Sequence, residues 1–268
     1  MQGVINPIWA TEMRLLEPIC TFTKYDGYDV FRSDLFPTYY GGNGLLLHEP
    51  ARKSLSEWEE TFHQHFDPEI FEHFFFTCDF AHAPESFEAD AEERGYDETS
   101  PMVGVLIEDE TSLVEDNDAH EIRLIESAED WAELLRFDMD SSREEKWFTE
   151  KACRELFEKS KHVSEAVGID WFGLYDRGGQ EIVAKLGIFK HGALARLQDV
   201  ATAEHRRREG LASELVSFAA RRALRNLGAE GLAICADVNY HALGLYRKLG
   251  GRDAIKQVYL MKFGKRRD

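Results

Sequence analysis

Hydrophobic and polar positions in the second half of the chain follow two periods, one typical of strands and the other of helices. Apolar or alternating runs predict strands over Glu121–Ile125, Trp171–Tyr175, Glu181–Phe189, Leu194–Thr202, Gly231–Val238 and Ile255–Phe263. Helical spacing predicts helices over Ala128–Asp138 and Arg143–Ala166, and a third from Leu211 to a glycine stop at Gly228. The order is strand, two helices, three antiparallel strands, helix, strand, helix, strand, which is an α/β arrangement.

The first half repeats the later part of this order more faintly. Strands are predicted at Gly44–Leu47, His73–Asp79 and Met102–Ile107, and helices over Ser54–Phe66 and Pro84–Tyr96. Between the halves lie residues 108–118, which are acid-rich and show little periodicity. We therefore predict two domains, 1–118 and 119–268, because 268 residues exceed one domain of ordinary size.

The net charge of −18 is unevenly distributed between these domains. Residues 1–118 carry 26 acidic and 6 basic side chains, whereas residues 193–268 carry 15 basic and 8 acidic ones. A strongly acidic half would repel a phosphate backbone, which argues against nucleic acid as a partner. The distribution suits a local polyanion site at the basic end and a cationic substrate drawn by the acidic half. The alternative is an acidic surface that only keeps the protein soluble.

Two patterns in the basic end point to a ligand. Where the strand Leu194–Thr202 gives way to an amphipathic helix, the chain reads Arg207-Arg208-Glu209-Gly210-Leu211-Ala212. The first N–H groups of a helix have no intrahelical acceptor, and glycine allows a polyphosphate to approach them, so this junction predicts a pyrophosphate seat. Further along, the spacing N-x-x-A-x-x-x-Y-x-x-x-G is made by Asn239, Ala242, Tyr246 and Gly250.

These patterns, in this order and separated by one helix and one strand, resemble the two signature motifs of the GNAT superfamily of N-acetyltransferases. The resemblance implies the acyl-CoA N-acyltransferase fold, an α/β (α+β) fold with a mixed sheet, in two tandem copies, with acetyl-CoA as co-substrate. At the matching positions it implies these cofactor-binding residues: Val200, Ala201, Thr202, Arg207, Arg208, Gly210, Leu211, Ala212, Ser213, Asn239 and Tyr246. The first half lacks the phosphate pattern and has Pro50, which cannot donate an amide hydrogen bond, near its helix start, so we expect a degenerate, non-catalytic copy there.

Acetyl transfer to an amine requires the neutral amine, and an ammonium with a pKa of about 10.4 is deprotonated only about once in 2,500 molecules at pH 7. In the resembled family, backbone amides of the strand at 198–202 can polarise the thioester carbonyl, which points to Val200 and Thr202. Tyr246 falls where a tyrosine commonly protonates the CoA sulfur. The alternative for these side chains is ordinary packing in a sheet or on a helix.

The general base is less clearly indicated. The strand positions that often carry Glu or His in the resembled family fall on Arg196 and Gln198, and neither is a base at neutral pH. Asp199 is the catalytic candidate, although strand alternation turns it to the other face of the sheet unless a bulge intervenes. A route through ordered water is the alternative to Asp199.

Other chemistry is weakly indicated. A histidine-rich patch is formed by His63, His65, His73, Cys78 and His82, but the first two point to different sides of a helix, and we expect no metal. The four cysteines show no paired spacing and no apolar run is long enough for a membrane span, so a cytoplasmic protein is predicted. The oligomeric state, monomer or homodimer, stays open.

We therefore predict an acetyl-CoA-dependent N-acetyltransferase that acts on a primary amine, in a small molecule or a peptide. Direct transfer is favoured because no cysteine lies near either motif as an evident acyl carrier. The alternative is a non-catalytic CoA-binding or partner-interaction module. Donor length and acceptor identity are expected to depend on loops such as Ser141–Lys146 and on the first half.

Overall fold

The computed structural model describes residues 6–37, 39–79, 83–84, 86–96, 101–143, 149–239 and 241–263. The chain divides into two compact units, and each draws on distant parts of the sequence. The N-terminal unit comprises residues 16–104, 235–243 and 253–268, and the C-terminal unit comprises residues 1–15, 105–234 and 244–252. The two units thus interleave along the chain. The division into domains 1–118 and 119–268 stays a prediction from the sequence.

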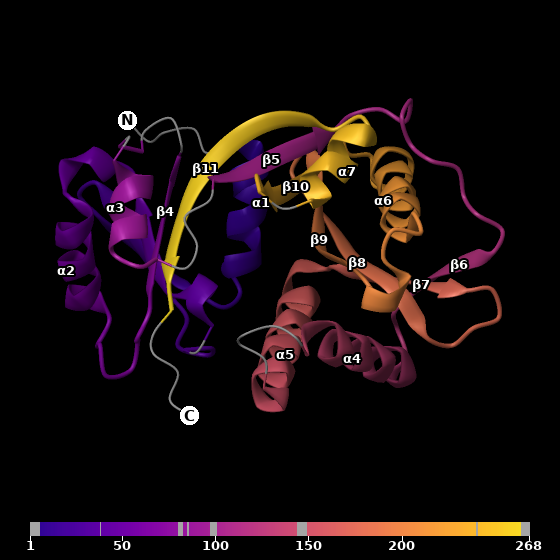
Figure 1. The fold of residues 1–268 in the computed structure, drawn as a ribbon, viewed down its shortest axis with the longest axis horizontal. Coiled ribbons are helices and arrows are strands. Elements are labelled where there is room, and N and C mark those ends of the chain that lie inside the picture. Colours follow the sequence, from indigo (N-terminus) through magenta and orange to yellow (C-terminus); the bar gives the residue numbers. More distant parts are fainter. Residues whose placement is uncertain are drawn as a thin grey trace. The chain divides into compact units, whose positions relative to one another are not determined.

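The C-terminal unit contains a mixed sheet whose strands follow the order β5-β10-β9-β8-β7-β6 (Figure 1). The strands that lie wholly or partly in this unit are β5 (Pro101–Ile107), β6 (His120–Leu124), β7 (Asp170–Asp176), β8 (Ile182–His191), β9 (Leu194–Thr202) and β10 (Gly231–Asp237). Its helices are α1 (Pro7–Leu16), α4 (Ala128–Ser142), α5 (Glu150–Val167), α6 (Leu211–Arg221) and α7 (Ala242–Lys248). The helices and strands predicted for 119–263 are present, but the helix predicted from Arg143 begins at Glu150, after the N-cap Thr149. Helix α4 continues to Ser142, so the first two residues of the predicted Ser141–Lys146 loop are helical, and the other ends shift by a few residues.

Neighbouring residues on β7 show how this sheet is covered on its two faces. The indole nitrogen of Trp171 donates to the Ser164 hydroxyl of α5 at 2.7 Å, whereas the ring of Phe172 packs edge-on against Phe218 of α6, 5.1 Å away. Because successive strand residues point to opposite faces, α5 covers one face and α6 the other. A buried apolar cluster that includes Leu134 of α4 lies on the α5 side.

The N-terminal unit contains strands in the order β1-β2-β3-β4-β11. The strands that lie wholly or mainly in it are β1 (Thr21–Tyr25), β2 (Tyr28–Arg32), β3 (Gly44–Leu47), β4 (Phe74–Asp79) and β11 (Arg252–Lys262), and the helices are α2 (Leu55–His65) and α3 (Phe87–Glu93). The last strand, β11, runs alongside β4 in Figure 1 and pairs with it antiparallel, from Gln257 opposite Asp79 to Lys262 opposite Phe74. The sequence predicts this strand correctly but not its partner, because period-2 alternation carries no information about which strand lies next to it.

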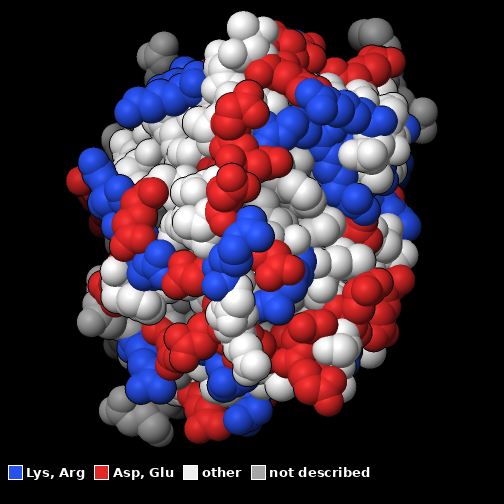
Figure 2. All heavy atoms as spheres, turned by 90° about the vertical axis from the view of Figure 1, so that its right-hand side faces the viewer, with Lys and Arg blue, Asp and Glu red and all other residues white. Residues whose placement is uncertain are grey.

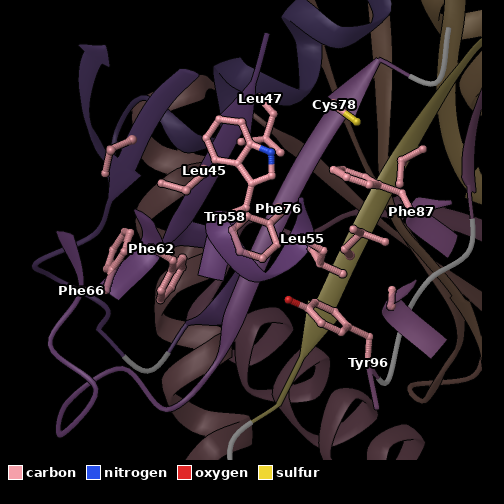
Figure 3. Close-up of a cluster of buried hydrophobic side chains, with 14 of the residues drawn as sticks. Leu45, Leu47, Leu55, Trp58, Phe62, Phe66, Phe76, Cys78, Phe87 and Tyr96 are labelled. Carbon is pink, nitrogen blue, oxygen red and sulfur yellow. The ribbon is translucent and has the colours of Figure 1, made fainter. Parts of the chain in front are cut away.

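Aromatic side chains fill the core of the N-terminal unit (Figure 3). Trp58 and Phe62 of α2 are fully buried, as is Phe66 at the helix end, where its ring stacks on Phe62 at 4.3 Å. The indole of Trp58 donates to the Pro50 carbonyl at 2.9 Å, so its one polar atom is satisfied. Val258 and Leu260 of β11 belong to the same buried cluster, which explains why the last strand is stable at this position.

The hairpin β1–β2 and helix α1 are not among the predicted elements. Tyr25 and Tyr28 pair across the hairpin, which leaves Asp26-Gly27 as a two-residue turn, with Gly27 at φ +86°. An Asp-Gly pair between Thr- and aromatic-rich runs is a strong hairpin signal, so the information was present in the sequence. Helix α1 begins at Pro7, and proline is common at the first position of a helix. Its apolar run is short, and the sequence does not indicate which element this run packs against.

Helix α1 is held in the C-terminal unit by a buried ion pair. Arg196 of β9 is 3% exposed, and its guanidinium contacts the Glu12 carboxylate and the Thr11 hydroxyl of α1. The Arg14 side chain also reaches the Ala166 carbonyl at the end of α5, at 3.4 Å. A segment more than 180 residues before β9 in the sequence is thus part of this unit.

We expect Glu12→Gln to lower the free energy of unfolding by about 3 kcal/mol, because it leaves the Arg196 guanidinium buried without its counter-ion. Urea unfolding would measure the loss. Glu150→Gln is the matched control, since the Glu150–Arg154 pair is exposed and should change stability by less than about 1 kcal/mol. Equal losses in the two variants would contradict the assignment of α1 to this unit's core.

A second stability prediction concerns His73 of the N-terminal unit, which is 1% exposed and whose Nε2 lies 2.9 Å from the Asn43 carbonyl. Burial lowers the pKa of His73, although the bond to Asn43 opposes this. The unfolded imidazole therefore binds a proton first as the pH falls, so stability is retained above about pH 6.5 and decreases below it, by up to about 1.4 kcal/mol per pH unit.

We expect this slope to be reduced in His73→Gln, which removes the titrating ring. Urea unfolding at pH 7.5 and pH 5.5 would measure it in the parent and in the variant. His63→Gln, at an exposed position of α2, should leave the slope unchanged. A parent and a His73→Gln variant with the same pH dependence would show that His73 plays no part in it.

Among the described residues, none of the helices has both the length and the apolar composition needed to cross a membrane.

Candidate functional site

Strands β9 and β10 separate after a short paired segment. Their parallel pairing joins three residue pairs only, and the last of them is Arg196 opposite Ala233. All residues of both strands are described, and the part of β9 from 197 to 202 has no partner on β10. The edge of β9 that faces away from β8 is therefore not paired with β10 over these six residues, which include the predicted residues Val200, Ala201 and Thr202.

The chain between β9 and α6 has an unusual backbone. Arg208 has φ +71° and Gly210 has φ +90°, both in the left-handed region, and the start of α6 lacks any side-chain cap. The first helical hydrogen bond runs from the Glu214 amide to the Gly210 carbonyl, at 3.1 Å. The amides of Leu211, Ala212 and Ser213 therefore precede the intrahelical ladder, as an anion site requires.

Helix α2, which follows β3 in the N-terminal unit, starts in a different way. Its N-cap Ser54 accepts a hydrogen bond from the Glu57 amide, and the Glu57 carboxylate accepts one from the Ser54 amide at 2.8 Å. This capping box occupies the helix start with the chain's own side chains and places a carboxylate there. A phosphate would have to displace both, which is the physical reason why α2 is unsuited to the role that α6 can take.

The three arginines of the loop before α6 differ in how strongly their guanidinium groups are paired with carboxylates. Arg206 makes two bonds to Asp176 at the end of β7, at 2.9 and 3.2 Å, and one to Glu209 at 2.8 Å, so it braces the loop. Its guanidinium also lowers the pKa of Asp176. Arg207 is half exposed and, among the described residues, its guanidinium makes one ion pair, with Glu204 at 3.8 Å, and Arg208 is exposed. Arg207 and Arg208 are thus the cations left available to a ligand at this loop.

The acid-rich segment 108–118 lies along α6 as a strap. Its contacts run along one side of α6 and of the helical turn that continues it. The backbone amides of Asn117 and Val114 donate to the Glu214 carboxylate and the Ser217 hydroxyl. Further along, the carboxylates of Asp116 and Glu110 pair with Arg221 and Arg225. Residues at this spacing form one stripe of a helix. Figure 2, which views the side on which β6 and β7 lie in Figure 1, shows acidic and basic side chains intermixed over this face. The acidity of the strap is therefore neutralised locally by arginines.

Asp199 lies in a β-bulge of β9. The pairing of β8 with β9 passes from Lys185 opposite Ala201 to Gly187 opposite Gln198, so that Asp199 and Val200 both stand opposite Leu186. Asp199 has φ +48°, and its side chain turns to the same face as Lys185, whose Nζ lies 2.6 Å away. Strand alternation alone would turn Asp199 to the other face of the sheet, and this bulge reverses that direction.

Lys185 and Asp138 complete a charged group that the sequence analysis does not predict. The Lys185 side chain is 3% exposed and its ammonium contacts both Asp199 and Asp138 of α4. Desolvation raises the pKa of Asp199, but the ammonium outweighs it and holds the pKa of this carboxyl below its usual value. Burial raises the pKa of Asp138. A single lysine within the apolar run Ile182–Phe189 was the signal available in the sequence.

Tyr246 lies in α7 and is 5% exposed. Its carbonyl accepts hydrogen bonds from the Leu249 and Gly251 amides, and Gly250 at φ +87° allows the chain to reverse there. A Cβ on Gly251 would lie 2.7 Å from that carbonyl, so the end of the motif is tightly packed. This packing fixes the helix turn that carries the Tyr246 side chain.

The remaining predicted residues have separate positions. Ala201 packs against the apolar cluster under α4 and α5 and stands opposite Lys185 of β8. Asn239 belongs to the segment assigned to the N-terminal unit, where its backbone amide donates to the Asp237 carboxylate at 2.6 Å.

Among the described residues no group of His, Cys, Asp and Glu could hold a metal, and His82 lies outside them. Residues 144–146 of the Ser141–Lys146 loop also lie outside them.

Comparison with known proteins identifies this arrangement. The model of the acetyltransferase (GNAT) family matches residues 128–251, which span the helices, the bulged strand and both motifs described above. Residues 128–251 of this chain therefore form a GNAT acetyltransferase domain. No curated protein sequence matches the chain.

Solved structures extend the GNAT fold to the whole chain. A GCN5-related N-acetyltransferase from Kribbella flavida is similar with a TM-score of 0.67 at 16% identity, covering 98% of this chain and 97% of its own. A functionally unknown conserved protein from Staphylococcus epidermidis has a TM-score of 0.73 at 15% identity, covering 91% and 94%. A tandem GNAT protein from the clavulanic acid biosynthesis pathway has a TM-score of 0.52 at 11% identity, covering 94% and 85%. The tandem GNAT fold expected from the sequence is thereby confirmed.

Proposed function

We propose that the C-terminal unit of this GNAT protein transfers the acetyl group of acetyl-CoA to a primary amine, of a small molecule or a peptide, by direct attack. The observation that carries the proposal is the uncapped start of α6, with left-handed Arg208 and Gly210 in front of it, beside the edge of β9 that is not paired with β10. The amides of residues 211–213 and the available guanidinium of Arg207 suit a diphosphate.

Residues of this unit fit the other needs of the reaction. The edge of β9 that is not paired with β10 would offer backbone groups to a pantetheine arm, and amides near Val200 and Thr202 would polarise the thioester carbonyl. Tyr246 would supply the proton that the departing thiolate takes up. Acetyl-CoA, when bound, supplies the activated acyl group.

Removal of the amine proton by Asp199 depends on the charge state of its carboxyl group. Asp199 is 57% exposed and could reach an amine, but its pairing with Lys185 makes the carboxylate a poor proton acceptor. We therefore favour removal of the amine proton through ordered water and not by Asp199. Such a mechanism predicts rates that rise with pH as more of the acceptor amine becomes neutral.

Direct transfer is supported by the state of Cys153, which lies on α5 in the same unit. Burial, together with the nearby Asp138 carboxylate, raises the pKa of its thiol. A buried, protonated thiol is a poor nucleophile and so a poor acyl carrier. The acetyl group is therefore not routed through Cys153.

A non-catalytic CoA-binding or partner-binding module remains the second candidate, because the carboxylate nearest to the bulge is neutralised by a buried lysine. Two measurements on the full chain separate the candidates. Calorimetry with acetyl-CoA tests binding, and thiol release in the presence of diamines, amino acids and lysine peptides tests turnover. Binding with turnover supports the enzyme, binding without turnover on the whole panel supports the module, and an absence of heat with any acyl-CoA would overturn both.

The cytoplasmic location, the monomeric or homodimeric state and the lack of a nucleic-acid partner stay predictions from the sequence.

A further inference from the structure

The bulge in β9 requires Asp199 to adopt a backbone conformation that is unfavourable for residues with a side chain. Asp199 has φ +48°, in the left-handed region where residues with a Cβ are uncommon. Its neighbours on β9 have no partner on β10, so that edge does not hold the bulge in place. Some other contact must stabilise the left-handed residue, because strained backbone persists only where the surroundings over-determine it.

Lys185 provides that contact. Its ammonium is buried between the bulge and α4, 2.6 Å from the Asp199 carboxylate and in contact with the Asp138 carboxylate. The Trp171 ring lies 5.3 Å away on the same face and limits the movement of the ammonium. Asp199 itself is 57% exposed, so the ion pair anchors an otherwise solvent-facing side chain to a rigid, buried point.

We propose that Lys185 is a positioning residue: by holding the Asp199 carboxylate it fixes Asp199 in the left-handed conformation and so sets the backbone of Val200 at the acetyl-CoA edge of β9. This inference rests on the proposed function for the identity of the ligand. It assigns Asp199 a conformational role in place of a role in proton transfer. It also assigns Asp138 the task of keeping the ammonium in place from the helix side.

The two roles of Asp199 are separated by a matched pair of variants, Asp199→Gly and Asp199→Ala. Both remove the carboxylate, and the exposed position makes folding of both secure. Glycine adopts positive φ readily, whereas alanine does not. Full-chain kinetics with the best amine of the panel should therefore show kcat within about twofold of the parent for Asp199→Gly, and at least about tenfold lower for Asp199→Ala.

The KM for acetyl-CoA should change by less than about twofold in Asp199→Gly and should rise in Asp199→Ala, because the displaced Val200 backbone is part of the acetyl-CoA edge. A general loss of folding would not spare Asp199→Gly in this way. Similar losses of kcat in Asp199→Gly and Asp199→Ala would overturn the proposal and restore Asp199 as a base. Unchanged kcat in both would show that the conformation of residue 199 does not matter.

Lys185→Met tests the anchor itself. It should lower kcat at least about tenfold, and the double variant Lys185→Met/Asp199→Gly should recover most of that loss, since glycine no longer needs the anchor. Thermal unfolding would be measured in parallel, because Asp138 loses its buried partner. If Lys185→Met fails to fold, the Asp199 pair decides the question.

Hydrogen exchange of residues 197–202, followed by mass spectrometry, keeps this test independent of activity. Asp199→Ala should exchange at least about tenfold faster than the parent over this segment, and Asp199→Gly should match the parent. If no amine is turned over by the parent, the proposed function fails, yet the exchange pattern still decides whether the bulge is held as described. Equal exchange in parent and Asp199→Ala would overturn the positioning role alone.

Discussion

A Gly210→Val variant is expected to bind acetyl-CoA at least about 100-fold more weakly than the parent. Gly210 has φ +90°, and left-handed backbone costs an ordinary residue about 1 to 2 kcal/mol and a β-branched residue more. The loop would relax away from this conformation and lose at least one amide bond to a charged phosphate, worth about 1.5 to 3 kcal/mol. Together these terms amount to about 2.5 to 5 kcal/mol, which corresponds to a loss of affinity of about 100-fold or more. Calorimetry with acetyl-CoA would measure the change.

Gly178→Val is the matched control for this variant. Gly178 lies in the β7–β8 turn with φ +77°, and an added Cβ at either glycine would meet open space, so the two substitutions impose the same kind of backbone strain. We expect Gly178→Val to lower stability while acetyl-CoA affinity stays within about twofold of the parent. If both variants bind acetyl-CoA equally well or equally poorly, the phosphate seat at α6 is wrong.

The second large effect is expected for Tyr246→Phe, which should lower kcat about 100-fold with little change in the KM for acetyl-CoA. General acid catalysis typically contributes a factor of about 100 to 10,000, and phenylalanine keeps the packing of the buried ring while removing the proton donor. Steady-state kinetics with thiol release would measure both constants. A loss confined to kcat indicates an interaction made only in the transition state.

Tyr175→Phe controls for the removal of a buried phenol in the same unit. Tyr175 is 2% exposed and packs in the cluster under α4 and α5, with the Arg123 guanidinium 3.6 Å from its ring centre. We expect this variant to change stability by about 1 kcal/mol and to leave kcat unchanged. A Tyr246→Phe enzyme that keeps more than half of the parent kcat would remove Tyr246 from the mechanism.

Local patterns predicted most of the helices and strands because each is encoded by a period along the chain. Strand β9 runs over Leu194–Thr202 as predicted, and Ser54 caps α2 as its sequence suggests. Gly210 was also identified from local sequence, since its place at a strand-to-helix junction requires little knowledge of the rest of the fold. The Asp26-Gly27 pair encodes the β1–β2 hairpin equally well, although this hairpin is not among the predicted elements.

The sequence by itself determined the GNAT domain and the tandem fold, and it predicts the phosphate-binding loop, because these depend on residues close together along the chain. Only the tertiary structure decided that β11 pairs with β4, that Glu12 of α1 neutralises Arg196, and that Lys185 anchors the bulge at Asp199. The first two join residues that are distant in sequence. The third depends on the bulge, which shifts the register of β9 by one residue at Asp199. Periodicity specifies which face of an element is buried, but the partner of a strand or a buried charge is set by the packing of the whole unit.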